Sequence, residues 1–172
     1  LPALRRALAG GAFAGAALWI TASAATGLPD ASKNLPALAL NPLDGGAAVT
    51  LAQVAPGQPR VVNLWATWCP PCRAEMPMLA AAQQREKHVA FVFADQGESA
   101  SAVHAYLTDQ GLPLRNVLLD AKSALLREVG SAGLPTTLFY DAQGRLVAAH
   151  VGPLNAAALE TRLRELRAGS GG

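Results

Sequence analysis

The chain has 172 residues, of which 51% are hydrophobic and 15% are charged, which is enough to bury the core of one domain with an appendage. The formal net charge is +2, and apart from Arg5 and Arg6 the basic residues equal the 12 acidic ones in number. This composition excludes a disordered chain, a basic surface for nucleic acid and a charged interaction tail.

The N-terminal segment has the pattern of a targeting element. Its two arginines precede an uncharged stretch over residues 7–25 that is rich in alanine, glycine and leucine, as in a signal peptide. Ala22-Ser23-Ala24 matches a small-x-small cleavage site, so we expect residues 1–25 to be removed. An uncleaved membrane anchor is the alternative, since the stretch is about long enough to cross a bilayer. Both versions place the domain outside the cytoplasm, in the bacterial periplasm.

A polar linker and a hairpin follow the targeting element. Residues 26–34 form the linker, with glycine, proline and asparagine among them. Residues 35–43 and 47–54 predict two short extended segments around the turn signal Asp44-Gly45-Gly46. This hairpin opens a domain that we place over residues 35–169.

At the centre of the chain a buried strand runs directly into a helix. The branched, apolar run 61–65 predicts a strand covered on both faces. From Pro70 the pattern is helical to about Lys87, because two successive prolines suit a first turn, where a missing N–H costs nothing. Pro77 lies inside this helix, where we expect it to introduce a kink.

The rest of the domain alternates strands and helices, which predicts an α/β fold with a central mixed sheet flanked by helices. Ser99 is a predicted N-cap, and Asn155 caps a final amphipathic helix before a tail over 169–172. The expected strands are 88–94, followed by a loop over 95–98, then 116–119, 136–140 and 146–151; the other expected helices are 100–110 and 123–130.

The two cysteines of the chain, Cys69 and Cys72, lie at the junction between the central strand and its helix. The helix N-terminus favours a thiolate at Cys69, whereas Cys72, one turn further on the apolar face, should be shielded. This asymmetry predicts a dithiol–disulfide exchanger. An exposed Cys69 attacks the disulfide of a partner protein, and Cys72 then displaces the reduced partner and closes the Cys69–Cys72 bridge.

Other roles for the cysteine pair fit the sequence less well. A structural disulfide would close only a very short loop and restrain little of the unfolded chain. Zinc would need two more ligands, yet the three histidines stand singly, and haem attachment is excluded because Arg73 follows Cys72 where histidine is required. A Cu(I) carrier that uses Cys69, Cys72 and Met76 is the alternative binding function, since thiolate and thioether ligands suit this ion.

The stretch 65–72 (WATWCPPC), Pro77 and the stretch 133–137 (GLPTT) resemble the thioredoxin superfamily and, more closely, its exported TlpA/ResA-like branch. The resemblance covers about residues 35–168, and the early hairpin is typical of this branch. It implies a thioredoxin-like fold in which Pro135 is a cis proline facing the disulfide. It also implies that the backbone of Leu134 pairs with a bound substrate, next to Trp68 and Pro70.

The resemblance also implies a proton acceptor for Cys72. Cytoplasmic thioredoxins keep a buried aspartate on the central strand, where this chain has Asn63, which cannot act as a base. The TlpA/ResA-like branch uses a glutamate that corresponds to Glu75. Three residues after Cys72, Glu75 shares its helix face, and burial there would raise the pKa of its carboxyl toward neutrality. The alternative is an ordinary helix glutamate that reaches solvent.

Family members mostly reduce specific disulfides outside the cytoplasm, in cytochrome c assembly or at the copper site of respiratory oxidases. We therefore expect a monomeric reductant without a cofactor or metal, with protein disulfides as substrates and a membrane thiol protein as electron donor. A disulfide-forming oxidant is the alternative, because direction depends on reduction potential. A peroxiredoxin is disfavoured, since its threonine three residues before the reactive cysteine is replaced by Ala66.

Overall fold

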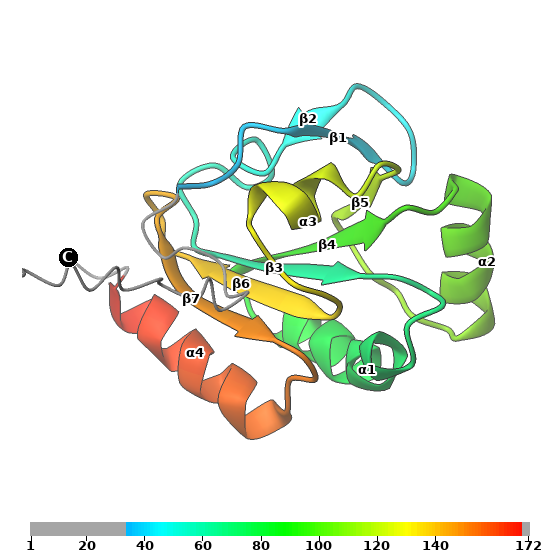
Figure 1. Cartoon of the computed structure of the whole chain (residues 1–172). Coiled ribbons are helices and arrows are strands. Elements are labelled where there is room, and N and C mark those ends of the chain that lie inside the picture. Colours follow the sequence, from blue (N-terminus) through cyan, green and yellow to red (C-terminus); the bar gives the residue numbers. More distant parts are fainter. Residues whose placement is uncertain (1–33, 170–172) are drawn as a thin grey trace, which may run out of the picture.

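Seven strands form a mixed sheet with helices on both faces, in a computed structural model that describes residues 34–169 (Figure 1). The predicted targeting segment 1–25 and the linker, apart from Asn34, lie outside the described residues. Within 34–169, none of the helices combines the length and the apolar character needed to cross a bilayer.

The strand order is β2-β1-β5-β4-β3-β6-β7, as in a thioredoxin-like fold with an N-terminal hairpin. The three central strands β3, β4 and β5 run parallel, while β6 and β7 continue the sheet antiparallel on one side and the hairpin β1–β2 does so on the other. The strands are β1 (Ala39–Pro42), β2 (Val49–Thr50), β3 (Arg60–Trp65), β4 (Ala90–Gln96), β5 (Val117–Asp120), β6 (Thr136–Tyr140) and β7 (Leu146–Val151).

Each face of the sheet has its own apolar core. Strand β3 is buried at every residue, and its side chains alternate between the two faces. Val61 and Trp65 pack in the core formed with α1, α2 and α4, whereas Val62 and Leu64 pack in the core formed with α3 and the hairpin segment. The helices are α1 (Pro70–Arg85), α2 (Ala100–Asp109), α3 (Ala124–Glu128) and α4 (Ala156–Gly169).

Several predicted boundaries are confirmed. Strands β6 and β7 have the expected ends. The Ser99 hydroxyl caps α2 by accepting a hydrogen bond from the N–H of Ala102 at 3.3 Å. Asn155 caps α4 in the same way, through the N–H of Ala158 at 2.9 Å.

Other boundaries differ from the prediction. Strand β4 begins and ends two residues later than expected, so the residues at 95 and 96, assigned to a loop, belong to the strand. Ser123 adopts a left-handed conformation (φ 49°) and makes no side-chain cap, because Asp120 already accepts the N–H groups of Ala124 and Leu125. The paired parts of the hairpin are also shorter than the predicted segments, and α1 ends at Arg85.

Strand register determines what surrounds the start of α1. Strand β3 lies between β4 and β6, with Leu64 opposite Thr136 and Trp65 opposite Asp95. The loop before β6 and the loop after β4 therefore both lie next to the segment that connects β3 to α1.

Candidate active site

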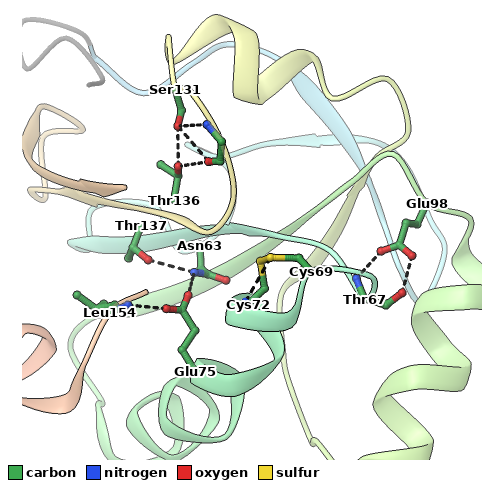
Figure 2. The surroundings of a disulfide bond; sticks show 11 residues. Asn63, Thr67, Cys69, Cys72, Glu75, Glu98, Ser131, Thr136, Thr137 and Leu154 are labelled. Carbon is green, nitrogen blue, oxygen red and sulfur yellow. Dashed lines mark hydrogen bonds between the residues drawn. A yellow bond between two sulfur atoms is a disulfide. The ribbon is translucent and has the colours of Figure 1, made fainter. Parts of the chain in front are cut away.

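Cys69 and Cys72 form a disulfide at the start of α1, with their Cα atoms 5.3 Å apart (Figure 2). Cys69 is the N-cap residue, and its sulfur accepts a hydrogen bond from the backbone N–H of Cys72 at 3.3 Å. Pro70 and Pro71 occupy the first turn, as expected. The sulfur of Cys69 thus lies at the positive end of the helix, which favours an anion.

Both cysteines are buried in this disulfide, so the expectation of an exposed Cys69 is wrong for the oxidised state. The exposed fraction is 3% for Cys69 and 0% for Cys72. The reason is geometric: the sulfur of Cys69 is bonded to a buried sulfur and is folded over the first turn of the helix. The neighbouring Trp68 and Pro70 are exposed, and Trp68 reaches 66%.

Glu75 is buried on the same helix, with an exposed fraction of 5%, so the alternative of a solvent-facing glutamate is wrong. One carboxyl oxygen accepts a hydrogen bond from Nδ2 of Asn63 at 2.9 Å, and the other accepts from the backbone N–H of Leu154 at 2.7 Å. Asn63 also donates to the hydroxyl of Thr137 at 3.0 Å, because these residues face each other across β3 and β6. Asn63 therefore orients the carboxyl group (Figure 2).

Burial changes the acidity of this carboxyl group. Loss of hydration raises the pKa of Glu75 above its usual value, while the hydrogen bonds from Leu154 and Asn63 and the charge of His150 oppose part of the rise. A carboxyl group with a raised pKa exchanges its proton closer to neutral pH than an ordinary glutamate does.

The loop before β6 faces the same junction. The peptide bond between Leu134 and Pro135 is cis, as the resemblance implies. The hydroxyl of Thr136 donates to the carbonyl of Gly133 at 2.6 Å and lies 2.6 Å from the hydroxyl of Ser131, while the carbonyl of Pro135 accepts from Gly152. The hydrogen bonds of Thr136 and of the Pro135 carbonyl thus hold the loop against its own start and against the segment after β7.

Two site features were missed by the sequence analysis. Glu98, in the loop after β4, accepts hydrogen bonds from both the backbone N–H and the hydroxyl of Thr67. Leu154 donates its N–H to Glu75 although it lies 79 residues further along the chain. Nothing in the spacing of these residues indicated the contacts, because they depend on which chain segments the sheet brings together.

Met76, the third ligand of the alternative copper site, is fully buried and packs in the core beneath α1. Within residues 34–169, no group of three or more histidine, cysteine or acidic side chains is arranged to hold a metal ion.

Comparison with known proteins places this geometry in a family. The family model described as Redoxin matches residues 26–163. The chain belongs to the Redoxin family. As a Redoxin protein with a thioredoxin-like fold, it is a thiol:disulfide oxidoreductase, and its Cys69–Cys72 disulfide lies at the start of α1.

Curated relatives carry the name thiol:disulfide interchange protein. HelX of Rhodobacter capsulatus is 31% identical over 81% of this chain and 78% of that protein. DsbE of Escherichia coli K12 is 32% identical over 90% of this chain and 87% of that protein. DsbE of Vibrio cholerae is 37% identical over a shorter match, which covers 58% of this chain and 53% of that protein.

Solved structures agree with the fold of this Redoxin chain. A thioredoxin-family thiol:disulfide interchange protein from Chlorobium tepidum superposes with a TM-score of 0.65 at 28% identity, over 81% of this chain and 97% of the other. A second structure from C. tepidum, assigned to DsbE, has a TM-score of 0.71 at 26% identity and covers 80% and 98% of the two chains.

The raised pKa of Glu75 predicts how stability depends on pH. A buried carboxyl group with a raised pKa binds its proton more tightly in the folded state, so its stabilising effect is complete at low pH and is lost as the pH rises through the folded-state pKa. Between the ordinary glutamate value of about 4.3 and that pKa, the free energy of unfolding should fall relative to Glu75→Gln, with a limiting slope of about 1.4 kcal/mol per pH unit.

Urea denaturation of the oxidised protein from pH 4 to pH 9 measures this difference. Glu165, which is exposed on α4, provides the control, since Glu165→Gln should run parallel to the unsubstituted protein. If the curve for Glu75→Gln also runs parallel, Glu75 does not titrate in the folded state as described.

Proposed function

We propose that this Redoxin protein reduces disulfides of proteins outside the cytoplasm, with Cys69 as the nucleophile. The thiolate of Cys69 attacks one sulfur of the partner's disulfide, that S–S bond breaks, and the other partner sulfur leaves as a thiol. Cys72 then attacks the sulfur of Cys69, which releases the second partner thiol and closes the bridge. Two electrons pass to the partner, and the protein becomes oxidised.

The observation that carries these roles is the position of Cys69 as the N-cap of α1. Its sulfur accepts the N–H of Cys72, and this donor remains available to a thiolate after reduction. Cys72 lies inside the helix and is fully buried. The sulfur at the edge of the helix therefore suits attack on a large partner, and the inner sulfur suits the intramolecular step.

We assign proton transfer at Cys72 to Glu75. Cys72 must lose a proton before it can resolve the mixed disulfide. Asn63 on the central strand cannot accept this proton, because its side chain is a neutral amide. Glu75 is a buried carboxyl group one turn further on the same helix, held in place by Asn63 and Leu154. Its raised pKa suits it to accept and return a proton near neutral pH.

The substrate surface that we propose consists of Trp68, Pro70, Leu134 and Pro135. Trp68 is one of the two large apolar side chains exposed within residues 34–169, and Pro70 beside it is also exposed. The loop that carries Leu134 and Pro135 is fixed by the bonds of Ser131 and Thr136. An extended substrate segment can add its backbone to that of Leu134, as in β-strand addition.

The charges around the disulfide support reduction as the direction. Carboxyl groups lie on both sides of the pair, Glu75 on one side and Glu98 on the other (Figure 2). A carboxylate near the pair opposes the stabilisation that the helix N-terminus gives to the Cys69 thiolate, and a reduced form that is less stabilised has a lower reduction potential. The relatives HelX and DsbE are named thiol:disulfide interchange proteins, which supports protein disulfides as the substrates. The resemblance to the TlpA/ResA-like branch implies a role in cytochrome c maturation or at the copper site of an oxidase, with a membrane thiol protein as electron donor.

Cys72→Ser should accumulate mixed disulfides with partners through Cys69, because attack proceeds and resolution does not. The variant is produced with its N-terminal segment, and adducts that dissolve in dithiothreitol are counted on non-reducing gels. Cys69→Ser is the matched control and should give few adducts. Equal trapping by both variants would contradict the proposed division of roles.

Glu75→Gln should slow disulfide exchange by about a hundredfold, the usual contribution of general acid–base catalysis. Glutamine keeps the size of the side chain and one hydrogen-bond acceptor but carries no exchangeable acid proton. The measurement is the pH dependence of the resolving step, in which Cys72 attacks the mixed disulfide at Cys69. Stopped-flow mixing of the reduced protein with a model disulfide monitors this step, and thermal melts are the control for folding. Coincident pH profiles of the two proteins would show that the proton of Cys72 leaves through water.

A further inference from the structure

Glu98 contacts the segment that leads to the nucleophile. Its carboxylate accepts the backbone N–H of Thr67 at 2.6 Å through one oxygen and the hydroxyl of the same residue at 2.5 Å through the other. Thr67 lies two residues before Cys69, in the connection between β3 and α1 (Figure 2). A single side chain from another loop thus holds both donors of this residue, and charge-assisted bonds of this kind are among the stronger ones.

The connection held by Glu98 is a tight turn. The N–H of Cys69 donates to the carbonyl of Ala66 at 3.2 Å, which closes the turn around Thr67 and Trp68. Trp68 projects from the turn into solvent. Because the turn contains the residue held by Glu98, this carboxylate limits how far both the indole of Trp68 and the start of α1 can move.

The carboxyl group of Asp95 contacts the backbone of Glu98. It is fully buried at the end of β4, and its Oδ1 accepts the backbone N–H of Glu98 at 3.2 Å. Its Oδ2 is also buried and has no hydrogen-bond partner within residues 34–169. Burial, together with a side-chain hydrogen bond to Glu98 and the charges of Glu98 and Asp120, raises the pKa of Asp95 to about 8.

One further charged group, Asp120, acts on this pair, and an aromatic pair lies beside it. Asp120 of β5 is already occupied by the N–H groups at the start of α3. Trp65 lies opposite Asp95 in the sheet and contacts Tyr106 of α2, and the guanidinium of Arg73 on α1 lies 5.5 Å from the centre of the Tyr106 ring. Within this environment, two adjacent carboxyl groups are compatible when one of them is protonated.

We propose that Glu98 is a positioning residue for Cys69, that it holds the turn through Thr67, and that Asp95 keeps it in place by accepting its backbone N–H. The proposal rests on the proposed role of Cys69 as the nucleophile. A held turn presents the sulfur and the indole in one fixed geometry to a protein disulfide, whose attack needs an aligned approach. A small alkylating reagent has no such requirement.

The test compares two rates on the reduced protein at pH 7. One is the rate of reduction of insulin disulfides, and the other is the rate of alkylation of Cys69 by iodoacetamide, located by mass mapping. In Glu98→Ala the rate of insulin reduction should fall about tenfold, which is the size expected for the loss of a charge-assisted hydrogen bond in an aligned step. The rate of alkylation of Cys69 should not fall. Glu98→Gln should recover most of the loss, because an amide can serve both groups of Thr67.

The proton on Asp95 is tested by the pH profile of insulin reduction. The rate of the unsubstituted protein should fall as the pH rises above 8, where the pair would carry two negative charges. Asp95→Asn should remove this fall, since an amide at this position can still accept the backbone N–H of Glu98 and acquires no charge as the pH rises. Glu165→Ala, on the exposed face of α4, is the control and should leave both rates unchanged.

The outcomes separate this proposal from the proposed function. If the ratio of the two rates in Glu98→Ala stays within twofold of the ratio in the unsubstituted protein, Glu98 does not position the nucleophile. If Glu98→Ala does not fold, Thr67→Val carries the same test, with an expected threefold fall in the ratio. If Cys72→Ser traps no partner through Cys69, the proposed function is wrong, whatever the ratios show.

Discussion

Strand β3 is paired along its length with β4 on one side and for most of its length with β6 on the other, and every residue in it is buried. A strand held in this way cannot slip by one residue without moving its apolar side chains to the wrong face. Its end point, and with it the start of α1, is therefore fixed relative to both neighbouring strands. The disulfide, the loop with the cis proline and the loop with Glu98 meet because of this register.

The same register also brings together the hydrogen-bond donors that hold the buried carboxyl group of Glu75 near the disulfide. Burying a carboxyl group in an apolar core is unfavourable unless it is hydrogen-bonded or protonated. Glu75 is served by Asn63, which β6 in turn holds through Thr137, and by the backbone of Leu154. The cost of desolvation is thereby reduced but not removed, and the remainder appears as a raised pKa, the property that proton exchange with a thiol requires.

Local patterns in the sequence predicted the cysteine pair and its helix, but they did not predict the contacts that distant segments make around the pair in the folded protein. The CxxC spacing, the two prolines after Cys69 and the apolar run before it are contiguous, so they identified the redox pair and the helix without tertiary information. The burial of Cys69 in the disulfide, the contact from Glu98 and the burial of Asp95 beside it arise between segments that the sheet brings together. Arg60 is a further case: its buried guanidinium donates to four carbonyls of residues 52–58, from the end of the predicted extended segment 47–54 into the residues that follow it, and nothing in the sequence pattern indicated this contact.

The reduction potential of the Cys69–Cys72 pair tests the central claim most directly. It is measured by equilibration with glutathione buffers and quantification of the two thiols at pH 7. If the nearby carboxyl groups oppose the helix N-terminus at Cys69, as a reductant requires, the potential should lie near that of thioredoxin, about −270 mV. A value near that of a strong oxidant, about −120 mV, would contradict the account, because it would mean that the site stabilises the reduced form.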